Sequence, residues 1–69
     1  MDKAKLEESV RLAIRPAEGN VRTIVEALTS TLPFGWNWVA DGVNGTIQIQ
    51  SEPVNIQING KVAIFNWNI

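Results

Sequence analysis

The segment Thr46-Ile-Gln-Ile-Gln-Ser-Glu-Pro-Val-Asn-Ile-Gln-Ile-Asn-Gly60 carries the clearest strand and turn signals of this chain. Apolar side chains alternate in it with Gln or Asn, which is the period of a β-strand with one buried face. Ser51-Glu-Pro53 interrupts the alternation and predicts a turn. Asn59-Gly60 predicts a two-residue hairpin of type I′, in which both central residues need positive φ. The stretch therefore predicts two adjacent antiparallel strands.

The same period of two continues on both sides of this stretch. Trp36-Asn-Trp-Val-Ala40 precedes it, and Lys61-Val-Ala-Ile-Phe-Asn-Trp-Asn-Ile69 follows it. Asp41-Gly-Val-Asn-Gly45 has the composition of a longer hairpin loop. These four segments predict a four-stranded antiparallel β-meander.

Before Gly35 the apolar period is that of a helix. Pro16 and Gly19 separate two helical segments, Asn20 is the expected N-cap of the second, and Pro33 with Gly35 ends it. The apolar stripes of the two helices are Leu6, Val10, Ala13 and Ile14, and Val21, Ile24, Val25, Leu28 and Leu32. The short link predicts a helix hairpin.

The order ααββββ predicts an α+β two-layer sandwich, in which the N-terminal helix hairpin packs on one face of the meander. We expect a single domain over residues 1–69, helical in 1–33 and sheet in 34–69. A core of this size is small, and the chain has neither cysteine nor histidine for a disulfide or a zinc site. Oligomerisation is the stabilising device that remains.

Strand alternation also predicts which side chains face the helices. The inward set is Ile47, Ile49, Val54, Ile56, Ile58, Phe65, Trp67 and Ile69. The outward set is Gln48, Gln50, Asn55, Gln57, Asn66 and Asn68. Val62 and Ile64 have the outward parity although they are apolar, which predicts that the last strand is enclosed or bulged.

The outward set is unusual because it is uncharged. Ten of the thirteen charged residues lie in the first 26 positions, whereas exposed sheets usually carry charges that discourage pairing with other chains. Three interpretations stay open: a soluble polar face, an interface with another copy or a protein partner, and a surface for carbohydrate or another polar small molecule. We take the six amides together with Phe34 and Trp36 as the candidate interaction residues.

Aromatic and charged side chains are further candidate sites. Trp36, Trp38, Phe65 and Trp67 can form a stacking platform for sugars or single-stranded nucleic acid, but a small domain needs such side chains for packing. The helix row Lys3, Glu7, Arg11 and Arg15 is interpreted as a solvated face. Arg11, Arg15 and Arg22 are expected to pair with acidic neighbours rather than bind an anion.

Catalysis and metal binding have little support in the sequence. Ser9, Ser30 and Ser51 lack an evident activating base, and Asp41, Asn44 and Glu52 lack the spacing of a calcium loop. A net charge of −1 disfavours nucleic acid. The sequence therefore predicts no enzyme activity, no metal and no cofactor.

The charged N-terminus does not resemble a signal peptide, and no apolar run approaches the length of a membrane helix, so we expect a cytoplasmic protein without a membrane association. We expect a small non-enzymatic protein–protein interaction module that forms a homo-oligomer or binds a larger protein, as adaptor or stoichiometric regulator. The alternative is binding of single-stranded nucleic acid or a polar small ligand through exposed aromatics and amides. The segment from Ile64 to Ile69 is predicted to be covered in the functional state, by a second copy through strand pairing or by a bound partner.

Overall fold

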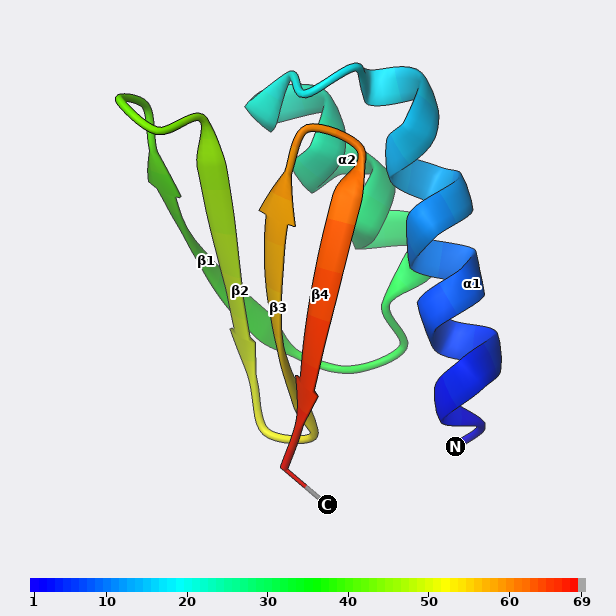
Figure 1. The fold of residues 1–69 in the computed structure, drawn as a ribbon. Coiled ribbons are helices and arrows are strands. Elements are labelled where there is room, and N and C mark those ends of the chain that lie inside the picture. Colours follow the sequence, from blue (N-terminus) through cyan, green and yellow to red (C-terminus); the bar gives the residue numbers. More distant parts are fainter. Residues whose placement is uncertain (69) are drawn as a thin grey trace.

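The computed structural model describes residues 1–68 and confirms the ααββββ order (Figure 1). Two helices form one layer: α1 (Lys3–Ile14), which a 3-10 turn, η1 (Arg15–Ala17), extends, and α2 (Val21–Thr31). The other layer is one antiparallel sheet with strands β1 (Trp36–Asp41), β2 (Thr46–Ser51), β3 (Val54–Asn59) and β4 (Val62–Trp67) in sequence order. In Figure 1, α1 lies beside β4, and β1 is at the opposite edge of the sheet.

Side-chain caps set the starts of both helices. The Asp2 carboxylate accepts a hydrogen bond from the Lys5 N–H at 3.1 Å, and the Asn20 side chain accepts one from the Thr23 N–H at 3.1 Å. Each cap satisfies a backbone donor that has no partner inside the helix. The predicted N-cap at Asn20 is confirmed. After η1 the chain reverses through Glu18 and Gly19, whose φ values are 51° and 79°.

One hairpin differs from the prediction. Asn59 is the last residue of β3 and pairs with Val62, so the turn residues are Gly60 and Lys61. Only Gly60 has a positive φ, 61°, which fits a type II′ turn rather than type I′. A turn at Asn59 and Gly60 would place Lys61 opposite the buried Ile58. The observed register leaves this charge in the solvent-exposed turn.

The core lies between the two layers and confirms the predicted faces. β3 alternates strictly between buried and exposed residues, and β2 does so from Ile47 to Gln50. Phe65 and Trp67 of β4 pack at the border of this core, and Ile69 lies outside the described residues. The buried side chains are Leu6, Val10, Ile14, Ala17, Ile24, Leu28, Leu32, Ile47, Ile49, Val54, Ile56, Ile58 and Ala63.

The prediction that the last strand is enclosed or bulged is wrong. β4 is an edge strand that pairs with β3 without interruption from Trp67 back to Val62. Val62 and Ile64 are 62% and 55% exposed on the outer face of the sheet. The reason is topological, because the last strand of a meander has no further strand beside it and the helices cover only the inner face.

Candidate interaction surface

The strand register arranges the outer face of the sheet into rows that cross all four strands. Asn37 pairs with Gln50, Gln50 with Asn55, and Asn55 with Asn66. All four side chains are exposed carboxamides. One row of the sheet therefore consists entirely of groups that can both donate and accept hydrogen bonds.

The neighbouring rows combine amides with apolar side chains. Gln48 and Gln57 pair with one another at the centre of the sheet, and Val39 and Ile64 flank them on the edge strands. Val39 is 58% exposed and Ile64 is 55% exposed. The third row contains Asp41, Thr46, Asn59 and Val62. Asp41, at a corner, is the one ionisable residue in these three rows.

The six amides predicted from the sequence lie around one open hollow of ≈ 500 Å³. They are Gln48, Gln50, Asn55, Gln57, Asn66 and Asn68. Asn68 is also anchored, because its side chain donates to the Glu52 carbonyl at 3.1 Å. A second hollow, of ≈ 230 Å³, lies beside it and includes Gln48, Gln57, Val62 and Ile64 in its lining. We call this whole outer surface of the four strands the amide face.

Phe34 and Trp36, the other two predicted site residues, do not belong to the amide face. Both are partly buried and pack against the core. Trp38 pairs with Ile49, Phe65 with Ile56 and Trp67 with Val54, and these three partners are buried on the inner face. These aromatic rings therefore share the helix side of the sheet, although Trp36 also lines a third open hollow, of ≈ 490 Å³, together with Asn37 and Gln50.

The carboxylate of Asp41 is engaged in its own loop. It accepts hydrogen bonds from the backbone N–H groups of Val43 at 3.0 Å and Asn44 at 3.2 Å, and from the Asn44 side chain at 2.7 Å. These bonds, those from the Asn44 backbone and side chain above all, hold the pKa of Asp41 below its usual range. The Asp41 carboxylate thus holds the β1–β2 loop together through these hydrogen bonds.

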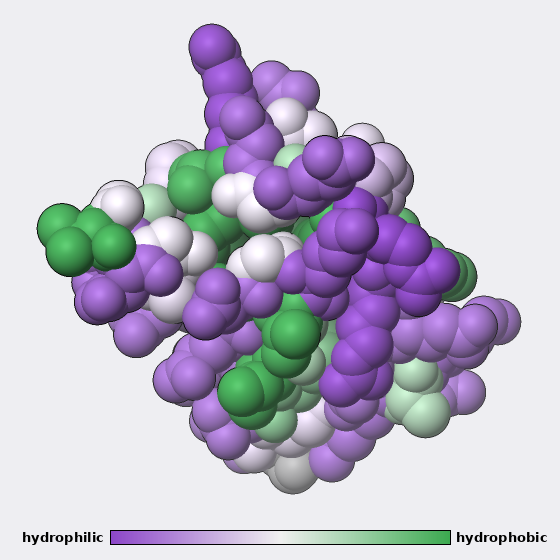
Figure 2. Space-filling view, turned by 45° about the horizontal axis from the view of Figure 1, so that its top comes forward, coloured by the Kyte–Doolittle hydropathy of each residue, from purple (hydrophilic) through white to green (hydrophobic). Residues whose placement is uncertain are grey.

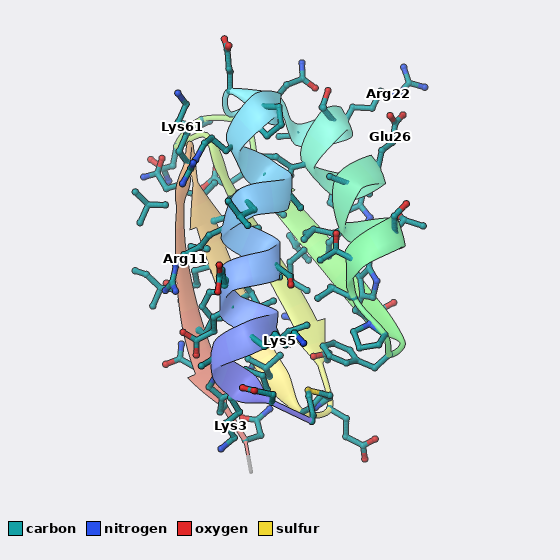
Figure 3. The ribbon with its side chains drawn as sticks, turned by 90° about the vertical axis from the view of Figure 1, so that its right-hand side faces the viewer. Lys3, Lys5, Arg11, Arg22, Glu26 and Lys61 are labelled. Atoms are coloured by element: carbon teal, nitrogen blue, oxygen red, sulfur yellow. The ribbon has the colours of Figure 1, made fainter. Side chains whose placement is uncertain are left out.

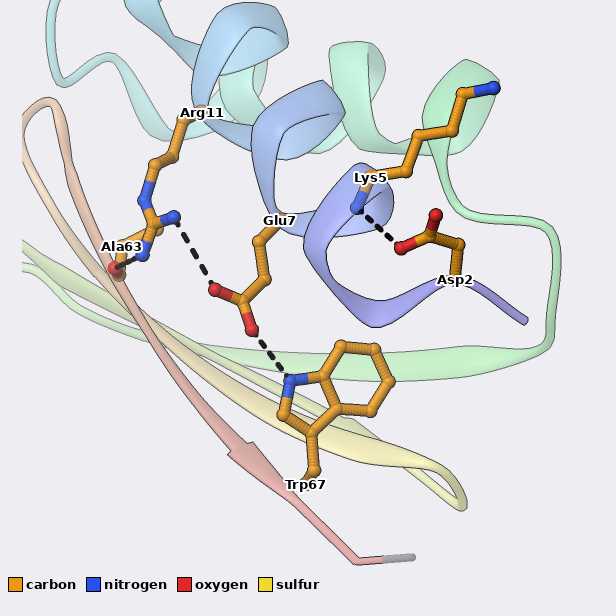
Figure 4. A network of polar contacts seen from close by, with 6 residues as sticks. All are labelled: Asp2, Lys5, Glu7, Arg11, Ala63 and Trp67. Carbon is orange, nitrogen blue, oxygen red and sulfur yellow. Dashed lines mark hydrogen bonds and ion pairs between the residues drawn. The ribbon is translucent and has the colours of Figure 1, made fainter.

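Glu7 and Arg11 of the predicted helix row contact β4 (Figure 4), whereas Lys3, Arg11 and Arg15 are exposed, so the prediction of a solvated face holds only in part. The Arg11 guanidinium lies 5.0 Å from the centre of the Phe65 ring and donates to the Ala63 carbonyl at 3.4 Å. Glu7 accepts from the Trp67 indole N–H at 2.8 Å. These two side chains reach the rings because α1 packs beside β4. Periodicity alone does not distinguish such a row from a solvated one.

Charge pairs, rather than a basic patch, occupy the helix layer. Arg11 pairs with Glu7 at 3.4 Å, and Arg22 with Glu26 at 3.9 Å. Figure 3 shows Arg11 directed toward β4 and Arg22 on the other side of this layer, so these two arginines do not converge. Figure 2 shows hydrophilic side chains over much of the end of the molecule that it views, with separate hydrophobic groups between them. On the amide face, by contrast, one row that crosses all four strands consists entirely of carboxamides.

Within residues 1–68, no three His, Cys, Asp or Glu side chains are grouped closely enough to hold a metal ion. Over the same residues, no helix has the length and apolar character needed to cross a membrane. Ser51 is engaged with the backbone of Val54 in the β2–β3 turn. Comparisons with protein-family models, with curated proteins and with solved structures find no match.

Proposed function

We propose that the protein is a small, non-enzymatic protein–protein interaction module that self-associates and acts as an adaptor or stoichiometric regulator. The amide face is its contact surface. The observation that carries this proposal is the composition of that face: three rows of mostly exposed side chains cross four strands, and Asp41 at a corner is their only ionisable member.

The cost of desolvation favours such a face as an interface. Removing an ionised group from water costs several kcal/mol even in real proteins, whereas an unpaired neutral amide costs about 1 to 3 kcal/mol. A carboxamide recovers most of that cost when it hydrogen-bonds across the contact. The exposed Val39, Val62 and Ile64 add apolar area, which contributes about 25 cal/mol per Å² when buried.

The size and the net charge of the chain also favour self-association. A domain of 69 residues has a small core, and a partner that covers the sheet adds buried surface to it. The net charge of −1 provides little repulsion between copies.

Sedimentation velocity over a concentration series tests the proposal. We expect the wild type to associate in the micromolar range. Gln57→Lys places a charge at the centre of the amide face without removing core volume, and we expect it to weaken association about tenfold or more. Ser30→Lys adds the same charge on the exposed surface of α2 and should associate like the wild type.

A wild type that stays monomeric at high micromolar concentration, while unfolding cooperatively, would contradict self-association. Equal association of Gln57→Lys and Ser30→Lys would remove the amide face from the contact.

A further inference from the structure

The two edges of the sheet differ in how their backbone groups are used. Antiparallel ladders alternate between hydrogen-bonded and non-hydrogen-bonded pairs, and a two-residue turn is closed by a hydrogen-bonded pair, here Asn59 with Val62. The alternation then directs the N–H and C=O of Ala63 to the open side of β4. The bond from Arg11 to the Ala63 carbonyl is consistent with this geometry.

The same alternation, carried across the sheet, assigns the open side of β1. Val39 and Asn37 bond to β2, so the N–H and C=O groups of Trp36, Trp38 and Ala40 point away from the sheet. In the part of the chain that the structure describes, no side chain bonds to these groups as Arg11 does on β4. β1 is therefore an edge without any such bond, whereas on β4 the Ala63 carbonyl has one.

The side chains of β1 also lack the usual protection of an edge. Edge strands commonly carry lysine or proline, but β1 has neither, and its one charge is at its last residue, Asp41. Trp38 is 45% exposed on the helix side, and Val39 is 58% exposed on the amide face. Apolar side chains are therefore exposed on both sides of an unpaired backbone.

We propose that β1 pairs antiparallel with β1 of a second copy around a two-fold axis at Trp38, which joins two sheets into one of eight strands. The inference rests on the self-association proposed above. With the axis at this residue, Trp38 of one copy is opposite Trp38 of the other, and Trp36 is opposite Ala40. All the open N–H and C=O groups of the strand then have partners.

The register suits a second copy of this chain. The bulky Trp36 side chain is opposite the small Ala40, and the two exposed Trp38 indoles cover one another. On the outer side, Asn37 is opposite Val39, and each Asp41 is opposite Gly35 rather than a second charge. The amide faces of the two copies become continuous, so this contact extends the surface described above.

Cysteine trapping tests the pairing directly, because the chain has no cysteine of its own. In Trp38→Cys the two thiols would lie in a hydrogen-bonded pair with Cα atoms about 5.5 Å apart. That separation is within the range of about 4.4 to 6.8 Å that a disulfide spans. We expect mild oxidation to convert most of this variant to a covalent dimer.

Asn37→Cys and Val39→Cys are the matched controls. Both positions are exposed. In the proposed dimer, however, each residue is displaced by two positions from the same residue of the second copy. The two Cα atoms are therefore more than about 7 Å apart, and a disulfide between them is strained. We expect these variants to remain mostly monomeric on a non-reducing gel. A monomeric Trp38→Cys, or controls that cross-link as fast, would overturn the proposal.

A proline variant tests the same edge without a thiol. Ala40→Pro removes an N–H on the open side, a position at which edge strands tolerate proline. We expect a folded protein whose association is about tenfold weaker. Ala40→Lys leaves the backbone intact and should weaken association similarly. Wild-type association by both variants would overturn the strand pairing.

These outcomes separate the two proposals. Suppose that Gln57→Lys weakens association, while Ala40→Pro associates like the wild type and Trp38→Cys does not cross-link. The amide face is then the contact, and only the inference about the β1 edge fails. A wild type that does not associate would contradict both.

Discussion

Glu7 shows how one side chain connects the two layers. One carboxylate oxygen is 3.4 Å from the Arg11 guanidinium, and the other accepts from the Trp67 indole at 2.8 Å. Arg11 in turn reaches the Ala63 carbonyl. The spacing of four residues predicts the pair of Glu7 with Arg11. It does not predict the contacts with Ala63 and Trp67, because these depend on which strand lies beside the helix.

Glu7→Ala is expected to reduce the free energy of unfolding by about 1 kcal/mol, because it leaves the Trp67 indole without its acceptor. This corresponds to a decrease in Tm of roughly 4 to 8 °C for a domain of this size. Glu8→Ala, at the exposed neighbouring position, is the control and should change stability by less than about 0.5 kcal/mol. Equal effects of the two variants would show that the indole bond is not stabilising.

The carboxylate of Asp41 makes the free energy of unfolding depend on pH. Because hydrogen bonds in the loop lower its pKa in the folded state, its contribution is present above the unfolded pKa of about 3.8 and is lost as pH falls through the folded value. Asp41→Asn should therefore be less stable than the wild type at pH 6, and the difference should shrink on acidification. Thermal unfolding between pH 6 and pH 2 measures this. A difference that does not vary with pH would contradict the assignment.

At the scale of elements, the period of the apolar residues predicts both helices and all four strands, and it separates the buried Ile47 from the exposed Gln48. The register of the last hairpin is less accessible to sequence reasoning. Asn-Gly favours a type I′ turn locally, but the cost of placing Lys61 opposite the buried Ile58 acts through the sheet. The register of this hairpin therefore follows from the cost of burying Lys61 rather than from the local preference of Asn-Gly.

Gly60→Ala tests that hairpin. At a φ of 61° an alanine side chain is strained, and we expect a loss of about 1 to 2 kcal/mol of stability. Gly42→Ala is the matched control, since that glycine lies in a hairpin loop without a positive φ and with open space around it. Its effect should stay within about 0.5 kcal/mol. Denaturant unfolding of both variants measures the contrast, and similar losses would contradict the turn assignment.

At the scale of the whole molecule, the sequence predicts the two layers and the six amides of the outer face, and the structure brings those six around one hollow. It does not predict the difference between the two edges. The last strand is the more apolar of the two in sequence, which predicts it as the covered edge, yet Arg11 of α1 contacts β4 at the Ala63 carbonyl and the Phe65 ring, and no side chain of the described residues makes such a bond to β1. That difference depends on the side on which the helix hairpin packs.

The dilution of a ¹⁵N-labelled sample, followed by NMR, tests the central claim that the uncharged sheet is the contact surface. We predict that concentration-dependent shifts are confined to the side-chain amides of Gln48 and Gln57 and their neighbours on the amide face, and to the backbone of β1. The exposed surface of α2 around Arg22 and Glu26 should show none. Shifts confined to the helices, or spectra that do not change with concentration, would contradict this contact surface.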